Sequence, residues 1–246
     1  INYLLEHGAD PNRMTHWQIT ALHQALRRDN PLENIEALLD HGADPALVAD
    51  GKSAAAIAAR RGRGDVLALF ERRRIPIELR GVERLITACA RNDATGVRAI
   101  AEQEPELVRD LMAEGGKLLA EFAGNGNSYG VRHLLDLGVE VGAQFEEGDG
   151  YWDVAKNSTA LHVAAWRARH ATVKFLIERG AAIDLKDGRG RTPLALAVRA
   201  CVDSFWTERR SPESVRALLN AGASVNGVPF PSGYAEVDDL LRSHEQ

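Results

Sequence analysis

The apolar residues of this chain alternate between two kinds of position. One kind is a cluster of small side chains, and the other is a pair of large apolar residues, usually followed three residues later by glycine. Small residues let neighbouring helices approach, and a short helix with one apolar face must bury it against others. The pattern therefore predicts stacked pairs of helices. The small clusters are Ala25, Ala58–Ala59, Ala88–Cys89, Ala164–Ala165 and Ala197, and the large pairs are Leu4–Leu5, Leu38–Leu39, Leu69–Phe70, Leu134–Leu135, Leu176–Ile177 and Leu218–Leu219.

Two short phrases recur with this alternation. Gly8 and Gly42 each lie in a His-Gly-Ala-Asp-Pro phrase, 34 residues apart, and Thr159 and Thr192 each open a phrase with leucine two residues later, 33 residues apart. Glycine ends a helix readily because it can adopt left-handed backbone angles. Threonine suits a helix start, and proline, here Pro193, suits the first helical position. The phrases thus mark the ends and the starts of the predicted helices.

A period near 33 with a Thr-Pro-Leu-His-like opening phrase resembles the ankyrin repeat. The resemblance implies an all-α repeat solenoid with β-hairpin finger loops, forming a single domain over residues 1–246. It is weaker in the two central repeats, which we place mainly by spacing. We expect a half-repeat at residues 1–12, with at least another half-repeat upstream in the natural protein. Six repeats are expected to begin near Thr20, Ser53, Glu83, Lys117, Thr159 and Thr192, followed by a capping helix at residues 235–244.

Composition and charge limit the classes of ligand and the cell compartments expected for this protein. The formal net charge of −5 gives no general attraction to nucleic acid or to anionic membranes. No apolar run reaches the roughly 18 residues that a membrane helix needs, and the start does not resemble a signal peptide. Cys89 and Cys201 lie far apart, without a metal-binding or redox spacing. We therefore expect a cytoplasmic protein in a reducing compartment.

The sequence contains no recognisable motif for catalysis or for metal binding. His23 and His162 fall in the opening phrase, where the ankyrin resemblance makes them structural, bonded to the threonine hydroxyl and nearby backbone. No His-Glu-x-x-His pair or zinc-like His/Cys spacing occurs, and no serine stands in a Gly-x-Ser-x-Gly phrase. We expect no catalytic residue, no cofactor and no metal, and we interpret the chain as a non-enzyme.

Arginines crowd the stretch from Arg60 to Arg84, with several acidic residues among them. One interpretation is a solvated helix face whose acids balance the arginines. The other is a basic patch for an acidic protein or for nucleic acid. Phe70, the aromatic residue of this stretch, belongs to a large apolar pair, so stacking on bases is poorly supported.

The ankyrin resemblance implies that partners bind the finger tips and the concave face made by the first helices. Trp17 lies at the expected tip of the first finger. Trp166 and Arg167 directly follow the small pair Ala164–Ala165, so we expect them to point outward from the concave face. Both residue types are enriched in binding hot spots. On this interpretation Trp166→Ala weakens binding and leaves melting nearly unchanged; the alternative is that Trp166 packs on its neighbours.

Two insertions of about nine residues interrupt the period, and insertions in repeat arrays map to loops, often on a binding face. The first precedes Thr159 and contains Tyr151 and Trp152. The second lies within the sixth repeat and contains Phe205 and Trp206. The alternative is that these aromatic residues only pin long loops to the solenoid.

The leading hypothesis is a non-catalytic, monomeric scaffold that binds another protein or a peptide. One alternative is a regulatory or targeting domain of a larger enzyme or effector. A second is binding of nucleic acid or an acidic partner through the Arg60–Arg84 stretch, with nucleic acid the less favoured ligand. The candidate partner-binding residues are Trp17, Tyr151, Trp152, Trp166, Arg167 and Trp206.

Overall fold

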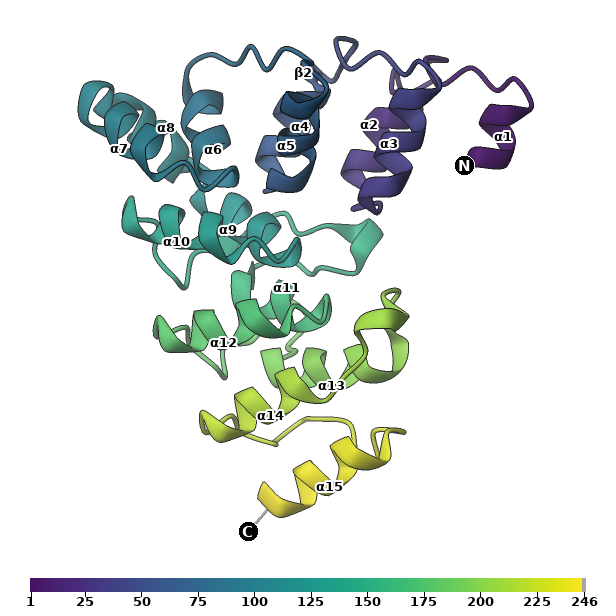
Figure 1. Cartoon of the computed structure of the whole chain (residues 1–246). Coiled ribbons are helices and arrows are strands. Elements are labelled where there is room, and N and C mark those ends of the chain that lie inside the picture. The colour runs from purple at the N-terminus through teal and green to yellow at the C-terminus, as the bar shows by residue number, and fades with distance from the viewer. Residues whose placement is uncertain (245–246) are drawn as a thin grey trace. The chain divides into compact units, whose positions relative to one another are not determined.

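The computed structural model, which describes residues 1–244, divides into two compact units (Figure 1). We call Ile1–Leu111 the N-terminal stack and Met112–Gln246 the C-terminal stack. Each is built from short helices in pairs, with only two-residue strands in the loops. The all-α repeat architecture confirms the predicted fold class. The single domain expected over residues 1–246 stays a prediction.

The N-terminal stack contains two rows of helices. Its elements are α1 (Asn2–Glu6), α2 (Ala21–Arg27), α3 (Leu32–Asp40), β1 (Val48–Ala49), β2 (Lys52–Ser53), α4 (Ala54–Arg60), α5 (Gly64–Arg72), α6 (Val82–Ala90), α7 (Ala94–Gln103) and α8 (Pro105–Ala113), the last of which ends just beyond the stack. One row runs through consecutive contacts of α2, α4 and α6, and a second through α1, α3 and α5. Each first helix also packs on the second helix of its own repeat.

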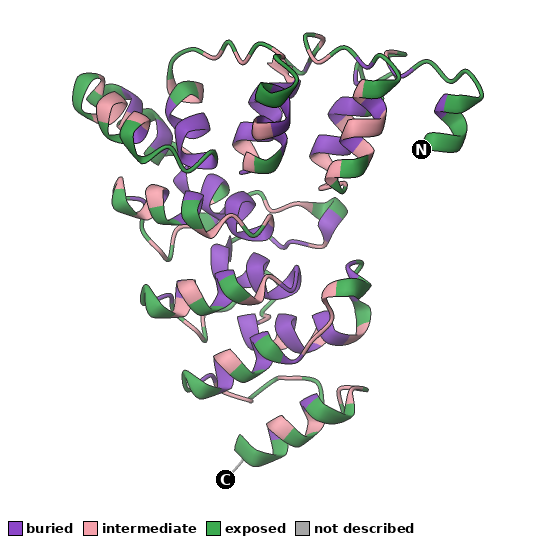
Figure 2. Ribbon diagram, viewed as in Figure 1, coloured by how far each residue is buried: buried purple, intermediate pink, exposed green. Residues whose placement is uncertain are grey.

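The C-terminal stack repeats this arrangement. Its elements are α9 (Gly115–Gly124), α10 (Ser128–Asp136), β3 (Gln144–Phe145), η1 (Gly150–Trp152), β4 (Ser158–Thr159), α11 (Ala160–Trp166), α12 (His170–Glu178), α13 (Pro193–Asp203), η2 (Thr207–Arg209), α14 (Glu213–Asn220) and α15 (Ala235–His244). Contacts join α9, α11 and α13 in one row and α10, α12, α14 and α15 in the other. The buried residues lie mainly where these helices face one another (Figure 2).

Four of the six predicted repeat openings coincide with helix caps, whereas Glu83 and Lys117 lie within the first turns of α6 and α9. Thr20, Ser53 and Thr192 each precede a first helix, and each side-chain oxygen accepts a backbone N–H from the third helical residue at 3.2–3.4 Å. Thr159 forms a capping box with His162, an arrangement that satisfies N–H groups that the helix itself leaves unpaired. Losing such a cap lowers stability by about 1 kcal/mol. The opening phrases therefore fix where four of the first helices begin.

The glycine that follows a second helix ends it as predicted. Gly42 has a φ of +84° and Gly180 a φ of +81°, in the left-handed region that L side chains rarely adopt. Beyond Gly42, the N–H of Ala43 donates to the carbonyl of Leu38 at 2.9 Å. The bond satisfies one of the carbonyl groups left free at the helix end.

The central part of the chain departs from the predicted pattern. α8 follows α7 where a finger loop is expected, and the sequence pattern does not predict this helix. Its start is explicable, because Pro105 occupies the first helical position and Glu106 lies in the first turn. Leu107 and Leu111, four residues apart, are both buried. A third helix therefore takes the place of a hairpin in this repeat.

The finger loops and the last helix complete the fold. In the N-terminal stack β1 pairs antiparallel with β2, and in the C-terminal stack β3 pairs antiparallel with β4. α15 covers the range expected for the capping helix and buries Val237 and Leu241, whereas Glu236, Asp239 and Arg242 are exposed. Its apolar stripe contacts α14.

Candidate partner-binding site

The histidine of the opening phrase joins its repeat to the next finger loop. His23 Nδ1 lies 2.7 Å from the hydroxyl of the capping threonine, and Nε2 lies 3.0 Å from the carbonyl oxygen of Leu47. His162 makes the same contacts at 2.8 Å and, with the carbonyl oxygen of Arg191, 3.1 Å. A carbonyl only accepts, so Nε2 donates, and a neutral ring accepts the hydroxyl proton at Nδ1.

Both histidine rings are fully buried. Burial lowers the pKa of His23 and of His162, although the carbonyl oxygens beside them act in the opposite direction. The neutral rings therefore serve as structural connectors. The contacts confirm the structural role predicted for these two residues.

The two insertions lie together in the C-terminal stack, although they belong to different repeats. Trp152 of the first insertion stacks on Trp206 of the second, with ring centroids 4.9 Å apart and 30° between the planes. Phe205 meets the Trp152 ring edge-on at 5.9 Å, and Tyr151 meets it edge-on at 4.8 Å. Such contacts between aromatic rings contribute about 0.5–1.5 kcal/mol each beyond the area they bury. We call these four residues the aromatic cluster.

Arg167 lies against the buried part of the aromatic cluster. Its guanidinium carbon is 5.1 Å from the centroid of the Trp152 ring and 5.4 Å from that of Trp206, and the residue is only 1% exposed. A cation placed over aromatic faces is attracted to them, by about 2 kcal/mol when desolvated. The prediction that Arg167 points outward is wrong, because the two insertions cover it.

Trp166 is covered as well. It is 2% exposed, and its Nε1–H donates to the backbone carbonyl of Trp152 at 2.6 Å. The guanidinium carbon of Arg199 lies 4.8 Å from the centroid of its ring. The prediction that Trp166 points outward is therefore wrong. The first insertion provides the carbonyl that a buried indole N–H requires.

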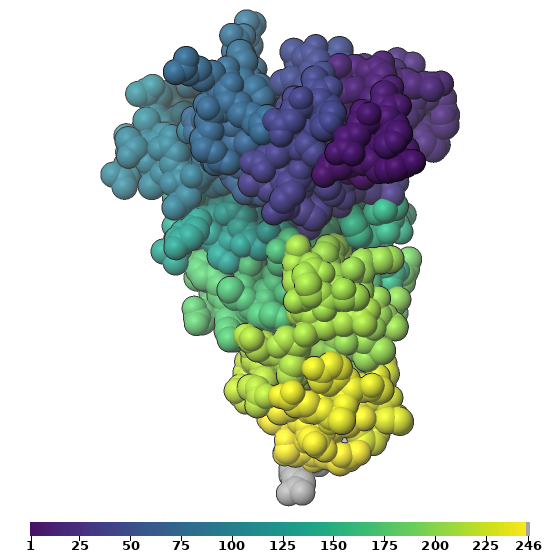
Figure 3. All heavy atoms as spheres, turned by 45° about the vertical axis from the view of Figure 1, so that its right-hand side comes forward, coloured from purple at the N-terminus to yellow at the C-terminus, as the bar shows by residue number. Residues whose placement is uncertain are grey.

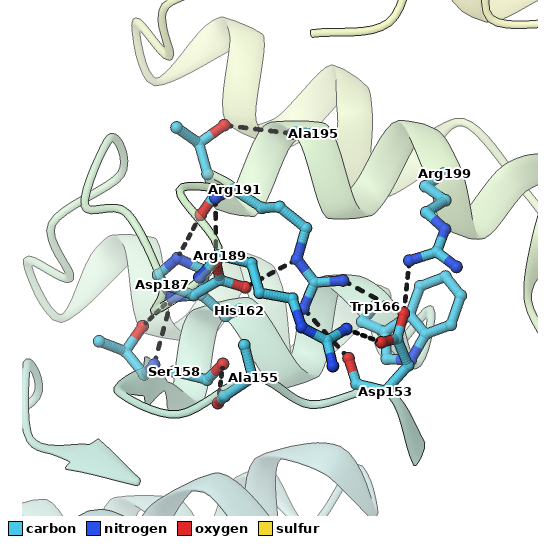
Figure 4. A network of polar contacts seen from close by, with 12 residues as sticks. Asp153, Ala155, Ser158, His162, Trp166, Asp187, Arg189, Arg191, Ala195 and Arg199 are labelled. Atoms are coloured by element: carbon cyan, nitrogen blue, oxygen red, sulfur yellow. Dashed lines mark hydrogen bonds and ion pairs between the residues drawn. The ribbon is translucent and has the colours of Figure 1, made fainter. Parts of the chain in front are cut away.

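Asp153 connects the first insertion to the sixth repeat (Figure 4). Its carboxylate accepts hydrogen bonds from Arg199 at 2.5 Å, from Arg191 at 3.2 Å, and from Arg189. Arg191 also donates to Asp187 at 2.9 Å. Burial acts to raise the pKa of Asp153, but the hydrogen bonds from Arg199 and Arg189 outweigh burial and hold that pKa below its usual range. Three guanidinium groups on one carboxylate thus hold the loop next to Trp152 in place.

The aromatic cluster has an exposed edge on a buried base. Trp152 and Trp206 are each 7% exposed, whereas Tyr151 is 53% and Phe205 is 65% exposed. In Figure 3 the yellow-green residues near position 205 lie at the surface of the C-terminal stack. The pinning interpretation therefore holds for the two tryptophans, and Tyr151 and Phe205 remain open to a partner.

Trp17 is placed differently. It is 67% exposed in the loop between α1 and α2, and its ring centroid lies 3.8 Å from that of His16. Its position agrees with the expected finger tip. A role for Trp17 in partner binding stays a prediction.

Most arginines between residues 60 and 84 face acidic residues. Arg74 and Arg80 are exposed and, within residues 1–244, have no acidic partner. The distribution favours a solvated, charge-balanced face over most of this stretch. The ion pairs in the stretch include Arg60–Glu83 at 2.6 Å, Arg63–Asp65 at 2.8 Å, Arg63–Asp29 at 3.4 Å, Arg72–Glu36 at 3.9 Å, Arg73–Asp40 at 2.5 Å and Arg84–Glu104 at 2.8 Å.

Neither cysteine is suited to nucleophilic chemistry. Burial raises the pKa of Cys89 to about 12 and that of Cys201 to about 11, so both thiols are protonated at neutral pH and are poor nucleophiles. Among residues 1–244 no group of three or more His, Cys, Asp or Glu side chains is arranged to hold a metal ion. The same residues include no helix with the length and apolar character to cross a bilayer.

The aromatic residues of both insertions are predicted from the sequence, but the contact between the two insertions is not. The missed residues are Asp153 and its arginine partners Arg189, Arg191 and Arg199. One signal was present in the sequence: the insertions have similar length, occur in consecutive repeats, and each contains a tryptophan. Loops of adjacent repeats lie near one another in a stack, so paired insertions indicate a shared surface.

Comparison with known families agrees with the paired helices, the histidine connectors and the left-handed glycines. A model of ankyrin repeats (3 copies) matches residues 1–80 and 85–228. The chain belongs to the ankyrin-repeat family. Ankyrin repeats are generally protein–protein interaction modules.

Individual relatives of this ankyrin-repeat chain match it in part or at low identity. Over 85 residues it is 35% identical to serine/threonine-protein kinase 12 of Arabidopsis thaliana, a match that covers 35% of this chain and 17% of the kinase. The human ASB11 ankyrin repeat domain is 20% identical, with 99% of this chain and 91% of that domain covered and a TM-score of 0.44. The ankyrin repeat domain of Bcl-3, described as a unique member of the IkappaB protein family, is 23% identical, with 89% and 90% covered and a TM-score of 0.40.

Proposed function

We propose that this ankyrin-repeat chain is a non-catalytic scaffold, acting as a monomer, that binds another protein through the aromatic cluster. Tyr151 and Phe205 would contact the partner, and Trp152, Trp206 and Arg167 would hold them in place. The observation that carries the proposal is the pair of exposed aromatic side chains resting on a buried tryptophan stack.

Rigid support is what makes the exposed edge a good binding surface. A side chain that is already held in place loses little conformational freedom when a partner binds, so more of the interaction energy appears as affinity. The ring contacts of Trp152 and the arginine bonds of Asp153 supply that support. Aromatic residues at the centre of an interface commonly dominate its binding energy.

Differential capture tests the proposal. Wild-type protein and a Tyr151→Ala/Phe205→Ala double variant are immobilised and exposed to lysate of the source cell, and retained proteins are identified by mass spectrometry. Tyr129→Ala is the matched control, because Tyr129 is an exposed aromatic residue of α10, in the same stack. Circular dichroism establishes that all three proteins fold.

We expect a protein that wild type and Tyr129→Ala retain and that the double variant loses. If the double variant retains the same set as wild type, the aromatic edge is not the binding surface. If Tyr129→Ala also loses the partner, the effect is not specific to the aromatic cluster.

A regulatory or targeting domain of a larger enzyme or effector is the second candidate function. One observation favours it: the relative that is 35% identical to this chain over 85 residues is a protein kinase, of which the match covers 17%. Determining the natural reading frame tests this candidate. A catalytic domain in the same reading frame would support it, and a frame with ankyrin repeats alone would contradict it.

A further inference from the structure

The link between α5 and α6 has the pattern of a strand without a strand partner. Residues 75–80 read Ile-Pro-Ile-Glu-Leu-Arg and belong to no helix or strand. Half-buried apolar residues at 75, 77 and 79 alternate with exposed residues at 76, 78 and 80. A period of two is that of an extended chain, and Pro76 keeps the residue before it out of the helical region. We call residues 75–80 the link segment.

The backbone of the link segment is almost entirely unpaired. The N–H of Ile75 donates to the carbonyl of Phe70 at 2.8 Å. Within residues 1–244, no N–H from residues 77 to 80 donates to another group of the protein, and no carbonyl from residues 75 to 80 accepts. These groups are available to a second chain, as at the edge of a sheet.

Neighbouring loops show why no internal partner forms. Between α3 and α4 the chain has room for the paired strands β1 and β2. The link between α5 and α6 is four residues shorter and forms no hairpin. In the following repeat α7 leads into α8, so that repeat supplies no strand either. Two successive repeats, those of α5 and of α7, therefore lack a finger hairpin. The link segment has no strand beside it from its own repeat or from the next one.

Positive charge borders the link segment. Arg74 and Arg80, at its two ends, are exposed and lack acidic partners within the described residues. The side chain of Arg72 is more than half exposed, and its acidic neighbour Glu36 lies 3.9 Å away. Glu78 is the single acidic residue between positions 74 and 80. The surplus of positive charge favours an acidic partner.

We propose that the link segment binds an acidic, extended peptide of another protein by β-strand addition. Backbone hydrogen bonds to residues 77–80 would hold the peptide, and the half-buried side chains of Ile77 and Leu79 would contact alternate apolar side chains of the peptide. Arg74 and Arg80 would select acidic residues. The link segment lies in the N-terminal stack, so this peptide site is independent of the aromatic cluster.

Three synthetic peptides test the inference on the full chain. The first is a fluorescein-labelled octapeptide of alternating glutamate and valine. The second has the same sequence with its four central backbone nitrogens methylated, which removes hydrogen-bond donors but keeps the charge. The third replaces every glutamate with lysine. Binding is measured by fluorescence anisotropy, and amide hydrogen exchange locates the bound peptide.

We expect the glutamate–valine peptide to bind on the order of tenfold more tightly than either control and to slow amide exchange at residues 77–80. Equal binding of the methylated peptide would show charge attraction without strand pairing and would overturn the inference. So would protection confined to other residues, or no binding. If the protein alone protects these amides as its concentration rises, the occupant is a second copy, which also overturns it.

A charge-reversal variant tests the role of the arginines, and a charge reversal in the other stack is its control. Arg80→Glu changes an exposed side chain, so it leaves the fold intact. We expect it to weaken binding of the glutamate–valine peptide several-fold and to strengthen binding of the lysine–valine peptide. Asp136→Lys, in the C-terminal stack, should change neither. An unchanged preference in Arg80→Glu contradicts the role assigned to the arginines.

Discussion

Two finger loops of this chain each contain a tryptophan, and they use it in opposite ways. In the loop between α1 and α2, Trp17 is 67% exposed and its ring contact is with the adjacent His16. In the loop between α10 and α11, Trp152 is 7% exposed and stacks on Trp206 from the next repeat. Both loops run from a left-handed glycine to a capping threonine. The repeat position is the same, and the surroundings differ.

The difference shows that position in the repeat does not determine exposure. The second insertion provides the stacking partner of Trp152, and the first insertion provides the carbonyl that binds the Trp166 indole. No comparable insertion follows Trp17 in its own stack. An aromatic residue in such an array becomes core when a neighbouring loop is long enough to cover it.

We expect Trp166→Ala to cause the largest loss of unfolding free energy, because Trp166 in α11 is covered by the first insertion, whereas Trp17 is exposed. Removing a fully buried tryptophan leaves a cavity and costs about 3–5 kcal/mol of unfolding free energy. It also leaves the carbonyl of Trp152 without its donor. Urea denaturation followed by circular dichroism measures the loss. A midpoint shift no larger than that of an exposed-site variant such as Tyr129→Ala would contradict the core assignment.

Gly180→Val tests the helix end between the two insertions. The φ of Gly180 is +81°, where a β-branched residue is strained, so we expect a loss of about 1–3 kcal/mol. Gly142→Val is the matched control: Gly142 lies in the same stack, is not among the positive-φ glycines, and has no atom within 4 Å of an added Cβ. Thermal melting of both variants measures the difference. Equal melting temperatures would show that the left-handed angle is not required.

The sequence predicts best what local rules decide. Thr20 with His23, and the glycines at 42 and 180, act within one helix end or between one repeat and its next loop, so a recurring phrase is enough to identify them. α8 was missed because its repeat lacks both phrases. The burial of Trp166 depends on the carbonyl of Trp152, 14 residues before it in an inserted loop, and no local pattern records that contact.

His23 and His162, one in each stack, should make the unfolding free energy depend on pH. Burial holds the pKa of His162 below the ordinary value of about 6.5, so below that pH the unfolded chain binds more protons than the folded one. Stability contributed by the neutral ring is then complete above about pH 6.5 and falls as the pH drops below it, by no more than about 1.4 kcal/mol per pH unit for one proton.

Urea denaturation between pH 5 and pH 8 measures this dependence. We expect His162→Gln to be less stable than wild type at pH 8, because it loses the Thr159 and Arg191 contacts, and to show a shallower decline towards pH 5. His23→Gln is the matched variant in the N-terminal stack. An identical slope in wild type and both variants would contradict the assignment of the decline to the two rings.

Trp17→Ala carries the smallest expected change in stability. Since Trp17 is two-thirds exposed and its ring contact is with its sequence neighbour, the unfolding free energy should change by no more than about 0.5 kcal/mol. Retention of the protein partner by Trp17→Ala is then informative by itself, because the fold is unchanged. Lost retention would make the first finger part of the binding surface. Full retention, with loss in Tyr151→Ala/Phe205→Ala, would confine binding to the aromatic cluster and leave Trp17 as an exposed residue without a partner.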